Sequence, residues 1–150
     1  MFSFSKIQYL FSKEENMKIL NSVRSNEAKT SGEIRIFIES KCSYVNPMMR
    51  AQDLFRTYGM YKTEHRNAVL IYIAYKHKDF ALYCDKEIFA KTTQSFWSEE
   101  SKKLAIGFYQ KEYCACLIDC INNIGAQMAL HFPFHGENKN ELPDEIIFGK

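Results

Sequence analysis

The spacing of hydrophobic residues changes several times along the chain, and each change marks an expected helix or strand. Residues 30–39 read TSGEIRIFIE, in which every second position of the apolar run is isoleucine. A period of two predicts a strand with two unlike faces. One face would carry Ile34, Ile36 and Ile38, and the other Glu33, Arg35, Phe37 and Glu39. These charges are expected to form either a solvated sheet face or part of a site.

Helical spacing predicts a helix on each side of this strand. Ser12 followed by Glu15 has the spacing of a capping box, so a first helix is expected from Lys13 to about Lys29. Its inner face would consist of Met17, Leu20 and Val23. Asn46 before Pro47 is a suitable N-cap and first residue for a second helix, which would end at Gly59. The apolar positions of that helix would be Ala51, Leu54, Phe55 and Tyr58.

Two further strands are expected in the middle of the chain. Residues 67–75, NAVLIYIAY, are apolar on both faces, which is typical of a central strand covered by helices. The next apolar run, residues 80–84, follows after only four residues, too few for a crossover, so the two runs should form an antiparallel hairpin. The strand at residues 30–39 reaches the central strand through a helix, which predicts parallel pairing with a right-handed crossover.

The second half of the chain favours helices. One helix is expected to open near Ser95, with Trp97, Leu104 and Phe108 on its apolar side, and another to carry an apolar stripe from Tyr113 to Met128. The tail from residue 133 is polar except for residues 146–148, IIF, which would dock back on the domain. The expected order is α-β-α-β-β-α-α, in an α/β fold with a small mixed sheet.

This order brings three segments to one edge of the sheet, namely residues 30–33, 65–67 and 84–87. The side chains expected there are Ser31, Glu33, Arg66, Asn67, Asp85 and Glu87, with Glu99 from the helix that opens near Ser95. Carboxylate and amide oxygens suit a hard divalent cation such as calcium or magnesium. Arg66 would orient a phosphate or carboxylate. Alternatively, these residues form strand-end ion pairs and helix caps, which imitate sites.

Composition and charge narrow the function classes. No Pro/Gly/Ser-rich stretch divides the 150 residues, so one domain over residues 1–150 is expected. The net charge of +2, without a basic stripe, argues against a nucleic-acid partner. Neither a signal peptide nor a membrane span is expected. Five cysteines, three of them at Cys114, Cys116 and Cys120, suit reduced thiols and a cytoplasmic protein.

Other catalytic and metal motifs fit less well. A cysteine phosphatase would need an arginine where Met48 follows Cys42, and no D-x-D motif is visible. Zinc would need a fourth ligand beside the three clustered cysteines, two of which fall on an apolar helical face. His131 and His135 are separated by Pro133, which should end a helix. His65 could act as a general acid near neutral pH.

Several segments resemble, in order, the TPM domain family: TSGEIRIFIE, FRTYGMYKTEHRNAVLIYIA, DKEI, SFW and HFPFHGENKNELPDEIIFGK. The resemblance spans nearly the whole chain and looks closest to the short, stand-alone bacterial members. It implies a three-layer α-β-α sandwich, weak acid phosphatase activity in some members and calcium binding in others. The family pattern carries over to Thr30, Ser31, Gly32, Glu33, Arg66, Asn67 and Asp85.

The chain also departs from the pattern of this family. Residues 84–88 read CDKEI where the family commonly shows G-D-x-G-I, and residues 96–98 read FWS where it shows F-W-D. The chain therefore lacks two glycines, which would let the backbone approach a ligand closely, and one carboxylate, which would add to the affinity for a metal.

The residue patterns predict an acidic strand-end site for calcium or magnesium, and the resemblance implies a TPM-like domain with weak phosphomonoesterase activity at most. Asp85 and Arg66 are the expected catalytic residues, and Ser31 and Asn67 would contact the bound group. The expected metal ligands are Glu33, Asp85, Asn67 and Glu99. The partner would be a phosphomonoester or a protein. The alternative is a non-catalytic interaction domain with a large exposed aromatic patch around Tyr58, Tyr61 and Trp97.

Overall fold

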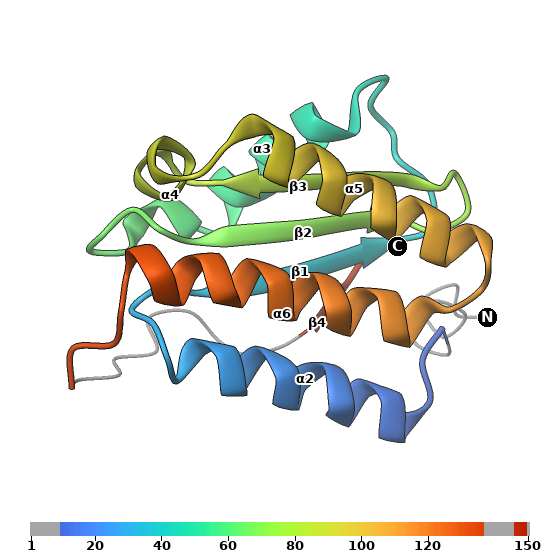
Figure 1. Cartoon of the computed structure of the whole chain (residues 1–150). Coiled ribbons are helices and arrows are strands. Elements are labelled where there is room, and N and C mark those ends of the chain that lie inside the picture. Colours follow the sequence, from blue (N-terminus) through green and yellow to red (C-terminus); the bar gives the residue numbers. More distant parts are fainter. Residues whose placement is uncertain (1–9, 137–145, 150) are drawn as a thin grey trace.

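The fold is seen in a computed structural model that describes residues 10–136 and 146–149. A mixed sheet lies between two layers of helices (Figure 1), as the resemblance implied. The elements are α2 (Lys13–Glu27), β1 (Ile34–Glu39), α3 (Pro47–Thr57), the 3₁₀ helix η1 (Met60–Lys62), β2 (Val69–Ala74), β3 (Asp79–Cys84), α4 (Lys86–Lys91), α5 (Gln94–Tyr109), α6 (Tyr113–His131) and β4 (Ile146–Phe148). None of the described helices is long and apolar enough to cross a membrane.

The strands are arranged in the order β3-β2-β1-β4. β1 and β2 pair in parallel, with Ile34 opposite Val69, and β3 returns antiparallel, with Cys84 opposite Val69. These pairings confirm the predicted parallel pair and the predicted hairpin. The apolar tail does dock back on the domain, and it does so as β4, which pairs in parallel with β1. This fourth strand was absent from the predicted order, since three residues are too few to show a period.

The two faces of the sheet are covered by different helices. Figure 1 shows α2, α5 and α6 on the near side and α3 on the far side. The isoleucines of β1 belong to the larger core cluster, on the side of α2, α5 and α6, while Phe37 belongs to the cluster that includes Leu54 and Phe55 of α3. The charged face of β1 is therefore covered by α3 and is not solvated: Glu33, Arg35 and Glu39 are at most 5% exposed.

Some predicted details were wrong. Met17 is 52% exposed, because α2 turns Ile19 and Asn26 inward together with the predicted Val23. This helix ends at Glu27, where the side chain is buried and accepts a hydrogen bond from the N–H of Ile34 at 2.8 Å. The helical region after Asp85 contains the short α4 before α5, which begins at Gln94 with Thr93 as its N-cap.

The close contact between α2 and α6 depends on Gly125. A Cβ atom at this position would lie 2.0 Å from Asn26 Oδ1 and 2.7 Å from Asn26 Cβ. Asn26 is held in place because its Nδ2 donates to the Ser22 carbonyl and to Asn122 Oδ1, each at 2.8 Å. The amide therefore cannot move aside without losing these hydrogen bonds.

Gly125→Ala is expected to lower the free energy of unfolding by about 1–3 kcal/mol, since the cost of overpacking exceeds the gain in helix propensity. Urea denaturation followed by circular dichroism would measure the change. The double variant Asn26→Gly/Gly125→Ala removes the colliding atoms, so it should lose less stability than the sum of the two single variants. Strict additivity would show that the two residues do not compete for the same space.

Candidate functional site

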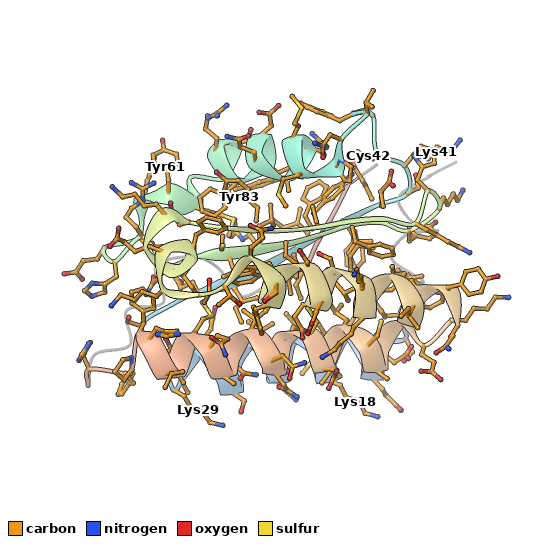
Figure 2. The ribbon with its side chains drawn as sticks, turned by 45° about the horizontal axis from the view of Figure 1, so that its top comes forward. Lys18, Lys29, Lys41, Cys42, Tyr61 and Tyr83 are labelled. Carbon is orange, nitrogen blue, oxygen red and sulfur yellow. The ribbon has the colours of Figure 1, made fainter. Side chains whose placement is uncertain are left out.

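Backbone hydrogen bonds join the three predicted segments at one edge of the sheet. The N–H of Val69 donates to the Glu33 carbonyl at 2.9 Å, and the N–H of Asp85 donates to the Ala68 carbonyl at 3.0 Å. The starts of β1 and β2 and the end of β3 are therefore neighbours. Tyr61 and Tyr83 mark this end of the molecule in Figure 2, and Lys41 and Cys42 mark the opposite end.

Arg66 and Asp85 form the central ion pair of this edge. Arg66 Nε lies 2.7 Å from Asp85 Oδ2, and Nη2 lies 2.8 Å from Oδ1, so the pair is bidentate. Asp85 Oδ1 also accepts the N–H of Lys86 at 2.8 Å and thereby caps α4. The carboxylate of Asp85 is buried, whereas the Arg66 side chain is 37% exposed. The hydrogen bonds to Asp85 raise the pKa of the Arg66 guanidinium.

Three clefts meet at the Arg66 side chain. The first, of about 340 Å³, is called the Arg66 cleft below; its lining includes Phe55, Tyr61 and Tyr83, with Arg56, Arg66 and Asp85 as the charged residues. The second, of about 560 Å³, follows β3, and the third, of about 390 Å³, lies beside His65, Glu87 and Lys91. The Arg66 cleft thus combines aromatic walls with two guanidinium groups and one carboxylate.

The Asn67 side chain is fully buried next to the segment that precedes β1. Its Nδ2 donates to Ser31 Oγ at 3.1 Å, while its Oδ1 is buried without a hydrogen-bond partner in the described part of the chain. Gly32 permits this arrangement, because a Cβ atom there would lie 3.1 Å from the Asn67 carbonyl oxygen and 2.5 Å from Met128 Cε. Thr30 fixes the same segment to the end of α6, since its hydroxyl bonds the carbonyl of Met128 at 3.1 Å.

Glu33 and Glu99 do not adjoin the Arg66 and Asp85 pair. Glu33 directly precedes β1, so β2 lies between it and Asp85, and two strand spacings amount to roughly 10 Å. Strand alternation also places Glu33 with Phe37 on the α3 face, whereas Asn67 lies with Val69 on the other face. Glu99 is exposed on α5 and lines none of the three clefts.

The oxygen atoms at this edge suit a divalent cation only in part. No three His, Cys, Asp or Glu side chains within residues 10–136 and 146–149 form a group that could hold a metal ion. Both carboxylate oxygens of Asp85 already accept hydrogen bonds from Arg66, which competes with a cation. The unpartnered Oδ1 of Asn67 is the atom that fits an oxygen-coordinated ion best. Asn67 lies on the other face of the sheet and lines none of the three clefts, so Asp85 and Asn67 offer ligand atoms at separate places, without a preformed cage.

The predicted aromatic patch does not form as one exposed surface. Tyr58 and Tyr61 are 40% and 41% exposed, but Trp97 is only 5% exposed and donates its indole N–H to Thr92 Oγ1 at 2.7 Å. His65 is exposed, and its ring lies 6.4 Å from that of His135. All five cysteines are free thiols.

Sequence reasoning missed the walls of the Arg66 cleft. Phe55 was predicted only as a core residue, and Arg56, Tyr61 and Tyr83 were given no place at Arg66. The sequence offered one signal for Arg56, namely that it follows Phe55 on a helix predicted to pack on the sheet. The contact itself, with the Phe55 and Tyr83 ring centroids 4.9 Å apart, required knowledge of how α3 crosses β3.

Comparison with known proteins shows which family and which solved structures this chain resembles. Residues 7–127 match the model of the TPM domain. The NMR structure of the BA42 protein from the psychrophilic bacterium Bizionia argentinensis is similar with a TM-score of 0.84 and 34% identity, over 93% of this chain and 95% of that one. The N-terminal domain of the cg2496 protein from Corynebacterium glutamicum shares the fold alone, with a TM-score of 0.62 and 10% identity over 91% of this chain and 80% of that one. No curated protein matches the chain. The chain belongs to the TPM domain family.

Proposed function

We propose that this TPM domain binds phosphomonoesters in the Arg66 cleft and hydrolyses them slowly, with calcium or magnesium as an aid. The observation that carries the proposal is the bidentate pair of Arg66 and Asp85, at 2.7 and 2.8 Å, in the wall of an aromatic cleft. A buried carboxylate holds the guanidinium in one orientation while 37% of the Arg66 side chain stays exposed. This is the arrangement of a fixed anion-binding group.

Arg66 retains hydrogen-bonding capacity for a ligand. A guanidinium carries five N–H donors, and only two of them bond to Asp85. The remaining donors suit the oxygens of a phosphate, which accepts paired N–H bonds from arginine. Arg56 adds a second positive charge to the same cleft, and the rings of Phe55, Tyr61 and Tyr83 suit an aryl or similar apolar ester group.

The proposed cation would supply charge neutralisation for the phosphate. Asp85 is the residue at the cleft that would hold it, through its carboxylate. Asn67, whose buried Oδ1 has no partner in the described part of the chain, lies on the other face of the sheet and stays a ligand predicted from the sequence. Ser31 would orient Asn67 through their 3.1 Å hydrogen bond. Glu33 and Glu99 remain ligands predicted from the sequence. In the proposed reaction, Arg66 orients the phosphate for attack by water, and Asp85 fixes Arg66.

Hydrolysis of an aryl phosphate by the purified chain tests this proposal. In the presence of magnesium or calcium, Arg66→Gln is expected to lower kcat/KM at least about 10-fold, since a charged hydrogen bond is lost. Asp85→Ala should lower it as strongly, because the same guanidinium loses its fixed orientation. The control is Lys18→Gln, which removes one positive charge far from the cleft (Figure 2) and should leave the rate unchanged.

Three measurements separate the components of the proposal. A rate that is equal in Arg66→Gln and in the parent chain would overturn the assignment of the cleft. Phosphate-dependent NMR shifts at Arg66 without turnover would reduce the proposal to binding. Calcium should raise the melting temperature of the parent chain but not of the Asp85→Ala variant; a flat melting temperature up to millimolar metal would remove the cation from the proposal.

A further inference from the structure

β3 lies at the outer edge of the sheet, with no described strand beyond it. Figure 1 shows this strand along the margin of the sheet, opposite β4. The strand contains no proline, glycine or lysine, which are residues that commonly protect such an edge. A six-residue strand in this position can accept a further strand.

The hydrogen-bonding register identifies which groups face outward. The N–H of Asp85 donates to the Ala68 carbonyl, so these residues form a hydrogen-bonded pair of the antiparallel ladder. Such pairs recur at every second residue, so Ala81 and Tyr83 direct their backbone groups toward β2. Leu82 and Cys84 consequently direct their N–H and C=O groups away from the sheet, as does Phe80.

The second of the three clefts, called the β3 groove below, lies along this edge. Its volume is about 560 Å³, and its lining includes Leu82, Tyr83 and Cys84 of β3. Met48 of α3 and Phe89 of α4 also line it, and these two residues are 42% and 50% exposed. The groove therefore combines unpaired strand groups with exposed apolar side chains, which are the two components of strand-addition sites.

One end of the groove is positively charged. Arg66 and Lys86 line it there, and the only carboxylate in the described lining, Asp85, is already bonded to Arg66. A ligand that extends along β3 would therefore meet an excess of positive charge at the Cys84 end.

We infer that the β3 groove binds an extended peptide of a partner protein, which adds to the sheet as a strand and places a carboxylate at Arg66 and Lys86. The backbone of the peptide would pair with Leu82 and Cys84, and its alternate side chains would contact Met48 and Phe89. This inference shares Arg66 with the proposed phosphate site, but strand pairing along β3 does not require phosphate hydrolysis.

Amide hydrogen exchange measured by NMR on the full chain tests the inference, with the capped heptapeptide acetyl-Glu-Thr-Val-Thr-Val-Thr-Glu-amide as probe. A glutamate at each end lets the peptide reach Arg66 in either direction. At a peptide concentration ten times Kd, exchange at Leu82 and Cys84 should slow about 10-fold. Exchange at Ala81 and Tyr83, which already bond to β2, should change less than about two-fold. The same peptide with glutamines at its ends should bind about 5- to 10-fold more weakly.

A matched pair of variants tests the strand contact itself. Cys84→Pro removes an outward N–H and should weaken binding of the probe at least about 5-fold, whereas Cys84→Ala keeps that N–H and should bind normally. Equal protection at all four amides, or none at saturating peptide, would overturn the inference. Protection of Leu82 and Cys84 that appears without peptide as the protein concentration rises would assign the edge to a second copy of the chain, which also overturns it. Aryl phosphate hydrolysis is measured separately, so either proposal can fail alone.

Discussion

Replacing Arg50 with methionine is expected to lower the free energy of unfolding by about 3–5 kcal/mol, because it leaves the buried Glu39 carboxylate without its cation. Arg50 Nε and Nη2 lie 3.0 and 3.1 Å from the two carboxylate oxygens of Glu39, whose side chain is 7% exposed. The Tyr72 hydroxyl donates to the same carboxylate. This hydrogen-bonded group connects α3 to β1 and β2 at the end of the sheet opposite the Arg66 cleft.

The Arg50 side chain also contributes packing. Its guanidinium carbon lies 5.6 Å from the centroid of the Phe37 ring and 5.7 Å from that of Tyr44. The hydrogen bonds to Glu39 raise the pKa of Arg50 further above its ordinary value, so the residue stays charged at any pH at which the protein folds. The loss in Arg50→Met is therefore chiefly the cost of an uncompensated buried carboxylate.

Urea denaturation at pH 7 measures the effect, and Arg56→Met on the same helix is the matched control. Arg56 pairs with Asp53 at 3.4 Å, but their side chains are 67% and 43% exposed, so this change should cost less than about 1 kcal/mol. The double variant Glu39→Met/Arg50→Met removes both charges and should recover most of the lost stability. Equal losses in Arg50→Met and Arg56→Met would show that the Glu39 pair is no stronger than a surface ion pair.

The order and pairing of the first three strands could be predicted from the sequence because the deciding features are local. Alternation fixed β1, the four-residue connection fixed the β2 and β3 hairpin, and the intervening helix fixed the parallel pairing. The meeting of Arg66 and Asp85 at one edge followed from this order. Their bidentate hydrogen bonds did not, since these depend on the left-handed backbone of Arg66, with φ of 49°.

Contacts between the helices and the sheet could not be predicted from the sequence pattern. The charges on β1 were expected to be solvated or part of a site, yet α3 covers them, and Glu39 finds Arg50 eleven residues later. Glu99 was expected at the site, whereas its neighbour Glu100 is the buried one and bonds Asn123 of α6 at 3.2 Å. In both cases the helix rotation decides which residue faces inward, and that rotation is set by packing between elements distant in sequence.

The free energy of unfolding is expected to fall as the pH rises from 9 to 11, because thiols that are partly or fully buried keep their protons only in the folded chain. Burial, and to a lesser degree Asp85, raises the pKa of Cys84 from 9.0 to about 12. Burial likewise raises the pKa of Cys116 to about 11, and that of Cys120 well above its ordinary value. Above pH 9 the unfolded chain loses these protons while the folded chain retains them.

The sign of the dependence follows from proton linkage. The folded state then binds more protons than the unfolded state, so stability is full below pH 9 and falls by about 1.4 kcal/mol per pH unit for each such thiol. For Cys84 the decline continues to about pH 12, where the folded thiol also ionises. Between pH 9 and 11 this single residue should account for about 2 kcal/mol of lost stability.

The contribution of Cys84 is isolated by comparing how steeply the free energy of unfolding falls with pH in the parent chain and in a variant. Urea denaturation of the parent chain and of Cys84→Ala at pH 8, 9, 10 and 11 should give curves that converge as the pH rises, because the variant lacks the titrating thiol. Cys116→Ala should converge likewise but level off near pH 11, in line with its lower pKa in the folded chain. Parallel curves for the parent chain and Cys84→Ala would show that this thiol ionises equally in both states.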